Sequence, residues 1–206
     1  MAKFQVAPTK TNLLNMKQNH KFAREGHDLL DQKREIIIAE LMGMVATAAE
    51  ISDNVDKLFA QAYKELDKAT VILGKDKLKN IARTINIEPK VTLSSRKVMG
   101  LPLPVVDVFV SEKKPYYSFL DTDVSLDEAV SKFRQILDTL AKLAQTKISV
   151  YRLAKEAQKT TRRVNALEKI YLPDYEETIS YINNVLEESE RESFFVLKLI
   201  KKRLKK

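Results

Sequence analysis

Residues 37–62 read IIAELMGMVATAAEISDNVDKLFAQA, and their apolar side chains recur in alternating steps of four and three. This is the heptad spacing of a coiled-coil helix. The pattern extends back to Leu13, loosens after Ala62 and ends near Gly74, a residue type that commonly follows a helix end. We therefore predict one long helix over residues 11–74. Its seam includes Ile37, Leu41, Met44, Ile51, Val55 and Leu58.

A second long helix is predicted over residues 125–204. It starts at residues 125–128, SLDE, which have the pattern of a capping box. The heptad spacing slips in phase after Ala144, and Pro173 is expected to kink or interrupt the helix. Its seam includes Leu126, Val130, Phe133, Leu137, Leu140, Val164 and Leu167.

The pattern between the two helices changes to that of β-structure. Residues 105–110 and 116–120 are rich in strand formers, and residues 111–115, SEKKP, have the composition of a hairpin loop. Residues 91–93 are a candidate for a further short strand. We expect a β-hairpin in this part of the chain.

These patterns predict an all-α dominated fold: a long antiparallel two-helix coiled coil with a small β-hairpin-containing insert between the helices. The expected regions are an N-terminal helix in 1–85, the insert in 86–122, and a C-terminal helix with a projecting basic tip in 123–206. A short connection makes neighbouring helices antiparallel.

The predicted register leaves the C-terminal end of the second helix without a partner. Setting Gly74 opposite Ser125 places Leu13 opposite about Leu186. Later residues have no counterpart on the first helix, so we expect them to project alone.

Composition restricts the class of protein. The chain has no Cys, which excludes disulfides and thiolate metal sites. Neither a signal peptide nor a run of ~18 apolar residues is evident, so we expect a soluble cytoplasmic protein. The net charge of +8 allows an acidic protein, a nucleic acid or an anionic membrane surface as partner.

The sequence contains no recognisable catalytic motif. Gly74-Lys75 is not a P-loop, because no Gly stands five residues earlier and Asp76 replaces the Ser or Thr. His20 and His27 lie two helical turns apart, roughly 10 Å, which is too far for one metal ion. We predict no catalytic, cofactor-binding or metal-binding residues and no direct binding of nucleotide.

Three polar residues, His20, His27 and Arg34, occupy the seam frame of the first helix. Polar seam residues set the register of a coiled coil at a cost in stability. They also occur where a helix contacts another protein. Both interpretations stay open on the sequence alone.

Basic residues gather at both chain ends, which antiparallel folding brings to the same end of the molecule. Such charges are either simply solvated or form a surface for an acidic or anionic partner. Nucleic-acid binding is less favoured, because no interleaved aromatic residues or reading motif accompany the charges.

Three segments carry a resemblance to a known family. Residues 8–17 contain PTK followed by LL and K, residues 26–35 read GHDLLDQKRE, and residues 162–168 read RRVNALE, followed by Leu172-Pro173. The chain resembles the D subunit of the V-type and A-type rotary ATPases. The similarity runs through the whole chain in order, and the insert is its least similar part.

The resemblance implies a non-catalytic central-stalk component, the rotor shaft that couples ATP hydrolysis or synthesis to ion transport by a membrane ring. Its partners would be the A and B subunits of the surrounding hexamer, the F subunit and the membrane-side rotor subunit. The protein would be cytoplasmic, attached to the membrane through the complex. The candidates for hexamer contact are Lys10, Lys17, Arg24, Glu190, Arg191, Lys198, Lys201, Lys202 and Arg203.

Two other functions compete with this one. The first is a free-standing coiled-coil tether or adaptor with a basic tip, and the second is a basic coiled coil that binds nucleic acid. Copurification with a hexameric ATPase distinguishes the shaft from the tether, and steep loss of affinity with salt identifies a nucleic-acid binder.

Overall fold

The computed structural model describes residues 4–85, 89–110, 117–118 and 122–204, and 82% of these described residues are helical. Two long helical stretches flank an antiparallel pair of strands, which confirms the predicted fold class. The chain forms two compact units. Unit 1 comprises Met1–Ile36 with Glu156–Lys206, and unit 2 comprises Ile37–Lys155.

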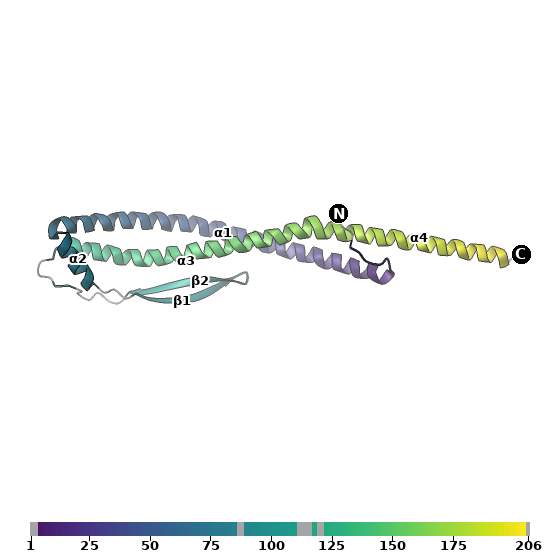
Figure 1. Ribbon diagram of the computed structural model, residues 1–206, viewed down its shortest axis with the longest axis horizontal. Coiled ribbons are helices and arrows are strands. Elements are labelled where there is room, and N and C mark those ends of the chain that lie inside the picture. Colours follow the sequence, from purple (N-terminus) through teal and green to yellow (C-terminus); the bar gives the residue numbers. More distant parts are fainter. Residues whose placement is uncertain (1–3, 86–88, 111–116, 119–121, 205–206) are drawn as a thin grey trace. The chain divides into compact units, whose positions relative to one another are not determined.

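The helices and strands follow one another along the chain as the predicted pattern requires, and Figure 1 shows them coloured by sequence. Their bounds are α1 Lys10–Leu73, α2 Lys75–Thr84, β1 Pro89–Val98, β2 Leu101–Val110, α3 Val124–Ala166, η1 Leu167–Tyr171 and α4 Leu172–Leu204. The long helical stretches thus match the predicted limits of 11–74 and 125–204 to within one residue.

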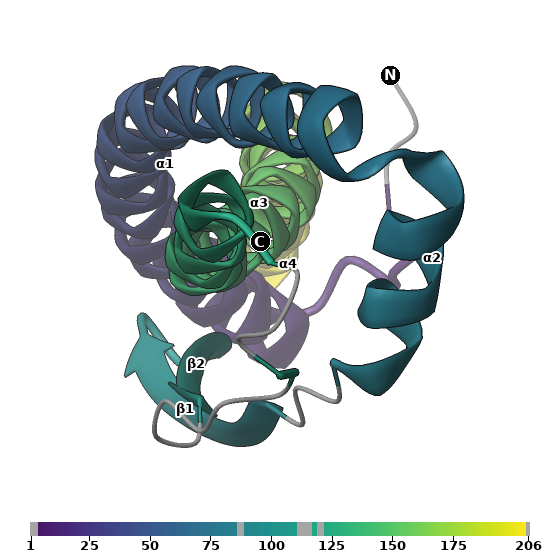
Figure 2. The same cartoon turned by 90° about the vertical axis from the view of Figure 1, so that its left-hand side faces the viewer.

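A glycine ends α1. Gly74 has a φ of 79°, a conformation that favours glycine, and its N–H bonds to the carbonyl of Thr70. Figure 2 shows α2 turning away from the line of α1 at this point.

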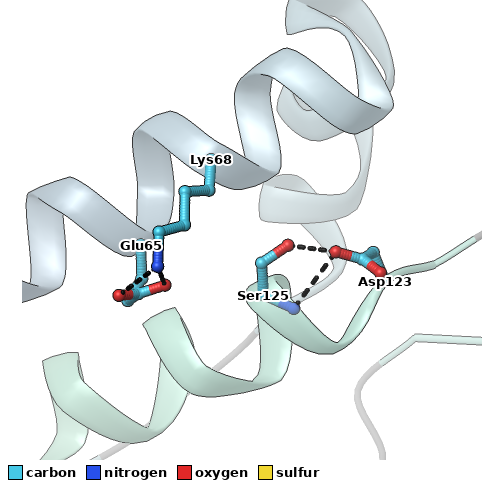
Figure 3. Close-up of polar contacts among 4 residues, drawn as sticks. All are labelled: Glu65, Lys68, Asp123 and Ser125. Atoms are coloured by element: carbon cyan, nitrogen blue, oxygen red, sulfur yellow. Dashed lines mark hydrogen bonds and ion pairs between the residues drawn. The ribbon is translucent and has the colours of Figure 1, made fainter.

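The start of α3 corrects the predicted capping box. Asp123 caps the helix: its Oδ2 accepts the N–H of Ser125 at 3.3 Å and also the Ser125 hydroxyl (Figure 3). These hydrogen bonds lower the pKa of the Asp123 carboxyl below its usual range. The helix therefore begins one residue earlier than predicted, because an Asp is as good a cap as a Ser and stands two residues before it.

The core of unit 2 lies between α1 and α3. Aromatic rings contribute to this core: the ring of Tyr63 of α1 packs edge to face against that of Phe133 of α3, with centroids 5.8 Å apart. The buried apolar residues of this unit are Ile37, Val55, Ala62, Ala69, Leu103, Leu126, Ala129, Ile136, Leu143 and Leu153.

The predicted seam residues differ in burial. Ile37, Val55, Leu126 and Val164 are buried, and Leu140 is 42% exposed. The remaining ones are half-buried: Leu41, Met44, Ile51, Leu58, Val130, Phe133, Leu137 and Leu167.

The predicted phase slip after Ala144 affects only part of the covered face of α3. One line of covered positions continues at seven-residue intervals without a break: Ala129, Ile136, Leu143, Val150, Ala157 and Val164. The neighbouring line does shift, because Leu126 and Leu153 are both buried but their separation is not a multiple of seven. The prediction assigned the larger side chains of Val130 and Leu137 to the seam. The more deeply buried side chains belong to the neighbouring line, which includes Ala129 and Ala157.

The hairpin differs from the predicted one. β1 pairs with β2 in an antiparallel register that joins Val98 to Leu101 and Pro89 to Val110, so the turn of this hairpin lies at Met99-Gly100. Residues 111–116 and 119–120 lie outside the described part of the chain, and Tyr117 and Ser118 are not in a strand. Local composition identified β2, and the candidate strand at residues 91–93 lies within β1, the strand that pairs with it.

The outer edge of β2 faces α3. The N–H of Val106 donates to Oε1 of Gln145 at 2.9 Å, and the carbonyl of Pro102 accepts from Arg152 at 2.7 Å. Residues two apart in a strand present their backbone groups to the same edge. The backbone nitrogens of Pro102 and Pro104, which carry no hydrogen, therefore lie on this outer edge and not on the edge that pairs with β1. That is why β2 tolerates two prolines.

Unit 1 packs the first part of α1 against the end of α3 and against α4. Its buried side chains are mostly small or polar, and they are Ala157, Thr160, Val164, Asp174, Thr178 and Ile182. Pro173 does not interrupt the helix. The five-residue π-helix η1 precedes it, and the N–H of Leu172 bonds to the carbonyl of Leu167 five residues back.

The N-terminal segment of unit 1 folds back onto α4 (Figure 1). The ring of Phe4 lies 4.7 Å from that of Tyr175, and the N–H of Phe4 donates to Oγ1 of Thr178 at 3.2 Å. Thr9 then caps α1 by accepting the N–H of Asn12.

Candidate interaction surfaces

The C-terminal end of α4 is uncovered, as the register predicted. Every described residue after Glu187 is exposed. Seven of these residues carry large apolar side chains: Phe194, Phe195, Val196, Leu197, Leu199, Ile200 and Leu204. An uncovered helix with this many apolar side chains is typical of a segment that enters a binding site on another protein.

An ion pair joins the two ends of the chain. Nζ of Lys10 lies 2.7 Å from Oε1 of Glu190. Their mutual hydrogen bond and attraction raise the pKa of Lys10 and lower that of Glu190 relative to their ordinary values. The predicted register put Leu13 opposite Leu186, so this contact agrees with it.

All other candidates for hexamer contact are also exposed. Lys17 and Arg24 lie further along α1. Arg191 pairs within α4 with Glu187 at 3.6 Å and Glu188 at 3.5 Å. The last turns of α4 carry Lys198, Lys201, Lys202 and Arg203. The structure therefore brings Lys10 and Glu190 together, whereas the basic residues in the last turns of α4 remain exposed.

The polar residues of the α1 seam are half-buried and make separate contacts. Nε2 of His20 lies 3.5 Å from Glu176 of α4. His27 contacts the adjacent Asp28, and Arg34 pairs with Asp31 at 2.5 Å. Among the described residues, no group of three or more potential ligands is placed to hold a metal ion.

Sequence reasoning missed a cavity of about 560 Å³ in unit 2, between the end of α1, helix α2 and the start of α3. Its walls are mainly apolar, and Lys75 and Lys79 of α2 are part of the lining. The signal in the sequence was the basic, amphipathic pattern of residues 75–84.

None of the described helices has an apolar stretch long enough to span a bilayer. A family model for the D subunit of ATP synthase matches residues 12–202. The chain is 38% identical to the V-type ATP synthase D subunit of Thermotoga neapolitana over 199 residues, covering 97% of this chain and 98% of the relative. It is 35% identical to the A-type ATP synthase D subunit of Thermococcus sibiricus, covering 96% and 94%. The corresponding A-type protein of Pyrococcus furiosus is 38% identical with the same coverage. The chain therefore belongs to the ATP synthase D-subunit family.

Proposed function

We propose that this protein is the rotor shaft of a V/A-type ATPase and couples the nucleotide chemistry of an A/B hexamer to ion transport in the membrane. In this role it is not itself catalytic. The observation that carries the proposal is the uncovered end of α4, which extends past the start of α1 with exposed apolar and basic side chains.

The end of α4 supports insertion into a surrounding ring of proteins. Phe194 and Phe195 are 68% and 63% exposed, and covering apolar surface contributes about 25 cal/mol per Å². A collar formed by the hexamer would supply that cover. The charges of the last turns add contacts that are individually weak, so no single pair would hold the shaft at one angle.

The cavity beside α2 in unit 2 supports a second set of contacts. It presents apolar walls with Lys75 and Lys79. We assign it to the membrane-side rotor subunit, which would offer an apolar segment with acidic flanks. The F subunit would bind elsewhere along the paired helices.

Copurification tests the proposed function. A tagged full-length chain expressed in its own cells should bring down the A and B subunits together with the F subunit, and the complex should hydrolyse ATP. A chain that purifies alone, or with an unrelated protein through its basic end, would instead be a tether or adaptor.

A further inference from the structure

The edge of β1 that does not pair with β2 carries backbone groups that point outward; we call it the free edge. The register identifies them, because the N–H of Val106 and the carbonyl of Pro102 point to α3 and not to β1. The residues directly across the hairpin, Leu93 and Lys97, therefore also turn their backbone groups away from the pairing. Since residues two apart share an edge, Val91 and Ser95 belong to the same set.

The free edge is open to solvent. All residues from Pro89 to Lys97 are exposed, whereas α3 lies along the other side of the hairpin, next to β2 (Figure 1). Among the described residues, none forms a hydrogen bond with the outward backbone groups of β1. A strand that offers a series of unpaired N–H and carbonyl groups is a template for the addition of a further strand.

Apolar side chains lie beside these backbone groups. Val91 and Leu93 are 55% and 75% exposed, and they lie on the face of the hairpin opposite to that of the buried Leu103. Val106 and Val108 pair directly with them and are half-buried on the same face. The apolar patch therefore extends to the free edge, where an added strand with apolar residues at alternate positions would cover it.

The charges of β1 restrict the kind of strand that fits. The strand contains Lys90, Arg96 and Lys97 and no acidic residue. Arg96 pairs with Glu40 of α1 at 3.2 Å, whereas Lys90 and Lys97 form no ion pair with a described residue. A second copy of β1 would bring the same positive charges against them, and like charges on neighbouring strands are destabilising. Acidic residues on the added strand would be attracted instead.

We propose that the free edge of β1 is the docking site for an extended segment of a partner protein, which adds a third strand to the two-stranded hairpin. The segment has apolar residues at alternate positions and an acidic residue near each end. Its length is about eight residues, because Lys90 and Lys97 are separated by roughly 23 Å at about 3.3 Å per residue. The inference concerns a surface separate from those of the proposed function and does not depend on it.

A synthetic strand tests the free edge on the pure full-length chain. The probe is the capped peptide Glu-Thr-Val-Thr-Val-Thr-Val-Glu, and the control peptide has Lys at both ends. On binding, the amides of Val91, Leu93, Ser95 and Lys97 should exchange more than about tenfold more slowly, as NMR measures. The Glu-ended peptide should bind at least about tenfold more tightly than the Lys-ended one. No protection of these amides, or equal affinity for both peptides, would overturn the proposal.

A proline variant tests pairing through the backbone. Ser95→Pro removes one outward N–H, and the hairpin should keep its fold because Pro104 occupies the directly opposite position of β2. Slow exchange of the Thr92 amide, which faces β2, checks that fold. The variant should bind the Glu-ended peptide more than about tenfold more weakly than Ser95→Ala, the matched control that keeps the N–H. Equal binding by the two variants would overturn the proposal.

A charge reversal tests the choice of an acidic partner. The double variant Lys90→Glu with Lys97→Glu should bind the Lys-ended peptide more tightly than the Glu-ended one, since both lysines are exposed and lie near the two ends of the edge. An unchanged preference for the Glu-ended peptide would show that these lysines do not select the partner.

Hydrogen exchange in the native complex tests whether the free edge is occupied there. The amides of Val91, Leu93, Ser95 and Lys97 should exchange more than about tenfold more slowly in the purified complex than in the pure chain. Unprotected amides in the complex would overturn the proposal, and so would a pure chain that forms a dimer in which these amides are protected. The proposed function fails separately, when no ATPase component copurifies with the chain.

Discussion

The backbone N–H of Val106 donates a hydrogen bond to the side-chain oxygen of Gln145 across 2.9 Å, so a side chain of α3 closes the outer edge of β2. The next polar contact along this edge is the one from Arg152 to the carbonyl of Pro102. Together these contacts fix the hairpin against the helix. The hairpin's position therefore depends on a few side chains as well as on the burial of Leu103.

Replacing Gln145 by Ala should loosen the hairpin without unfolding the helices. One partly buried hydrogen bond contributes about 0.5–1.5 kcal/mol, so hydrogen exchange at the Val106 amide should accelerate by up to about tenfold. NMR-detected exchange measures this. Thr146→Ala is the matched control, because the Thr146 hydroxyl bonds within α3, to the carbonyl of Lys142. Equal exchange in both variants would mean that Gln145 does not hold the edge.

Truncating a buried residue of α3 should destabilise far more than truncating an exposed one nearby. Ile136 is 3% exposed and Leu140 is 42% exposed. Ile136→Ala should lower the free energy of unfolding by about 2–5 kcal/mol, and Leu140→Ala by less than about half as much. Urea denaturation measures both values. A larger loss for Leu140→Ala would show that the packing frame in this part of α3 is different.

Stability should depend on the ionisation of Asp123. Its pKa is lower in the folded state than in the unfolded chain, where it is about 3.9. Its contribution is therefore present above about pH 4 and is lost as the pH falls through the folded pKa. Asp123→Ala should melt below wild type at neutral pH, with a difference that shrinks in acid. Asp123→Asn, which keeps the cap but removes the charge, should lie between them. Melting curves that show no such convergence would argue against this cap.

Removing the end of α4 should separate folding from assembly. Because every described residue after Glu187 is exposed, a chain ending at Glu187 should melt close to wild type. It should bind the hexamer more weakly and couple ATP hydrolysis to pumping less efficiently. Changing the six basic residues between 198 and 206 to Gln should give a smaller defect, since exposed charges contribute little singly. Gel filtration and ATP-driven pumping measure both effects. Full assembly and coupling in the truncated chain would place the torque contacts elsewhere.

The isolated chain should not bind Mg-ATP, because its sequence lacks a phosphate-cradling motif. Calorimetric titration of the pure protein should show no binding heat above that of dilution. The assembled complex, titrated in the same way, should bind nucleotide. Micromolar binding by the chain alone would contradict this prediction.

The long helices could be predicted because their signal is repeated many times along the chain. The glycine at 74 and the spacing from Ile37 to Ala62 defined α1 almost to the residue. The hairpin could not be predicted as well, because strand pairing depends on contacts between distant residues. Pro102 and Pro104 weakened the strand signal locally. In the folded protein their nitrogens lie on the outer edge of β2, where no backbone N–H is needed for pairing with β1.

For the candidate contact surfaces, too, some features could be predicted from the sequence and others could not. Their exposure followed from charge and register, and the pair of Lys10 and Glu190 agrees with the antiparallel alignment. The contact between Phe4 and Tyr175 was missed, since no periodic pattern links an N-terminal segment to a helix so far along the chain. The cavity beside α2 was missed because it is made by three separate elements.

The π-helix at Leu167–Tyr171 sets the angular position of everything that follows it in α4. A wide turn accommodates one residue more than an α-helical turn, and each residue advances the helix by about 100°. Deleting a single residue from η1 would therefore rotate the faces of the later helix by more than a quarter turn while leaving its composition unchanged. Phe194 and the terminal lysines would then point in new directions. The angular position of the side chains at the end of α4 thus depends on the one extra residue in the turn of η1, several helical turns earlier in the chain.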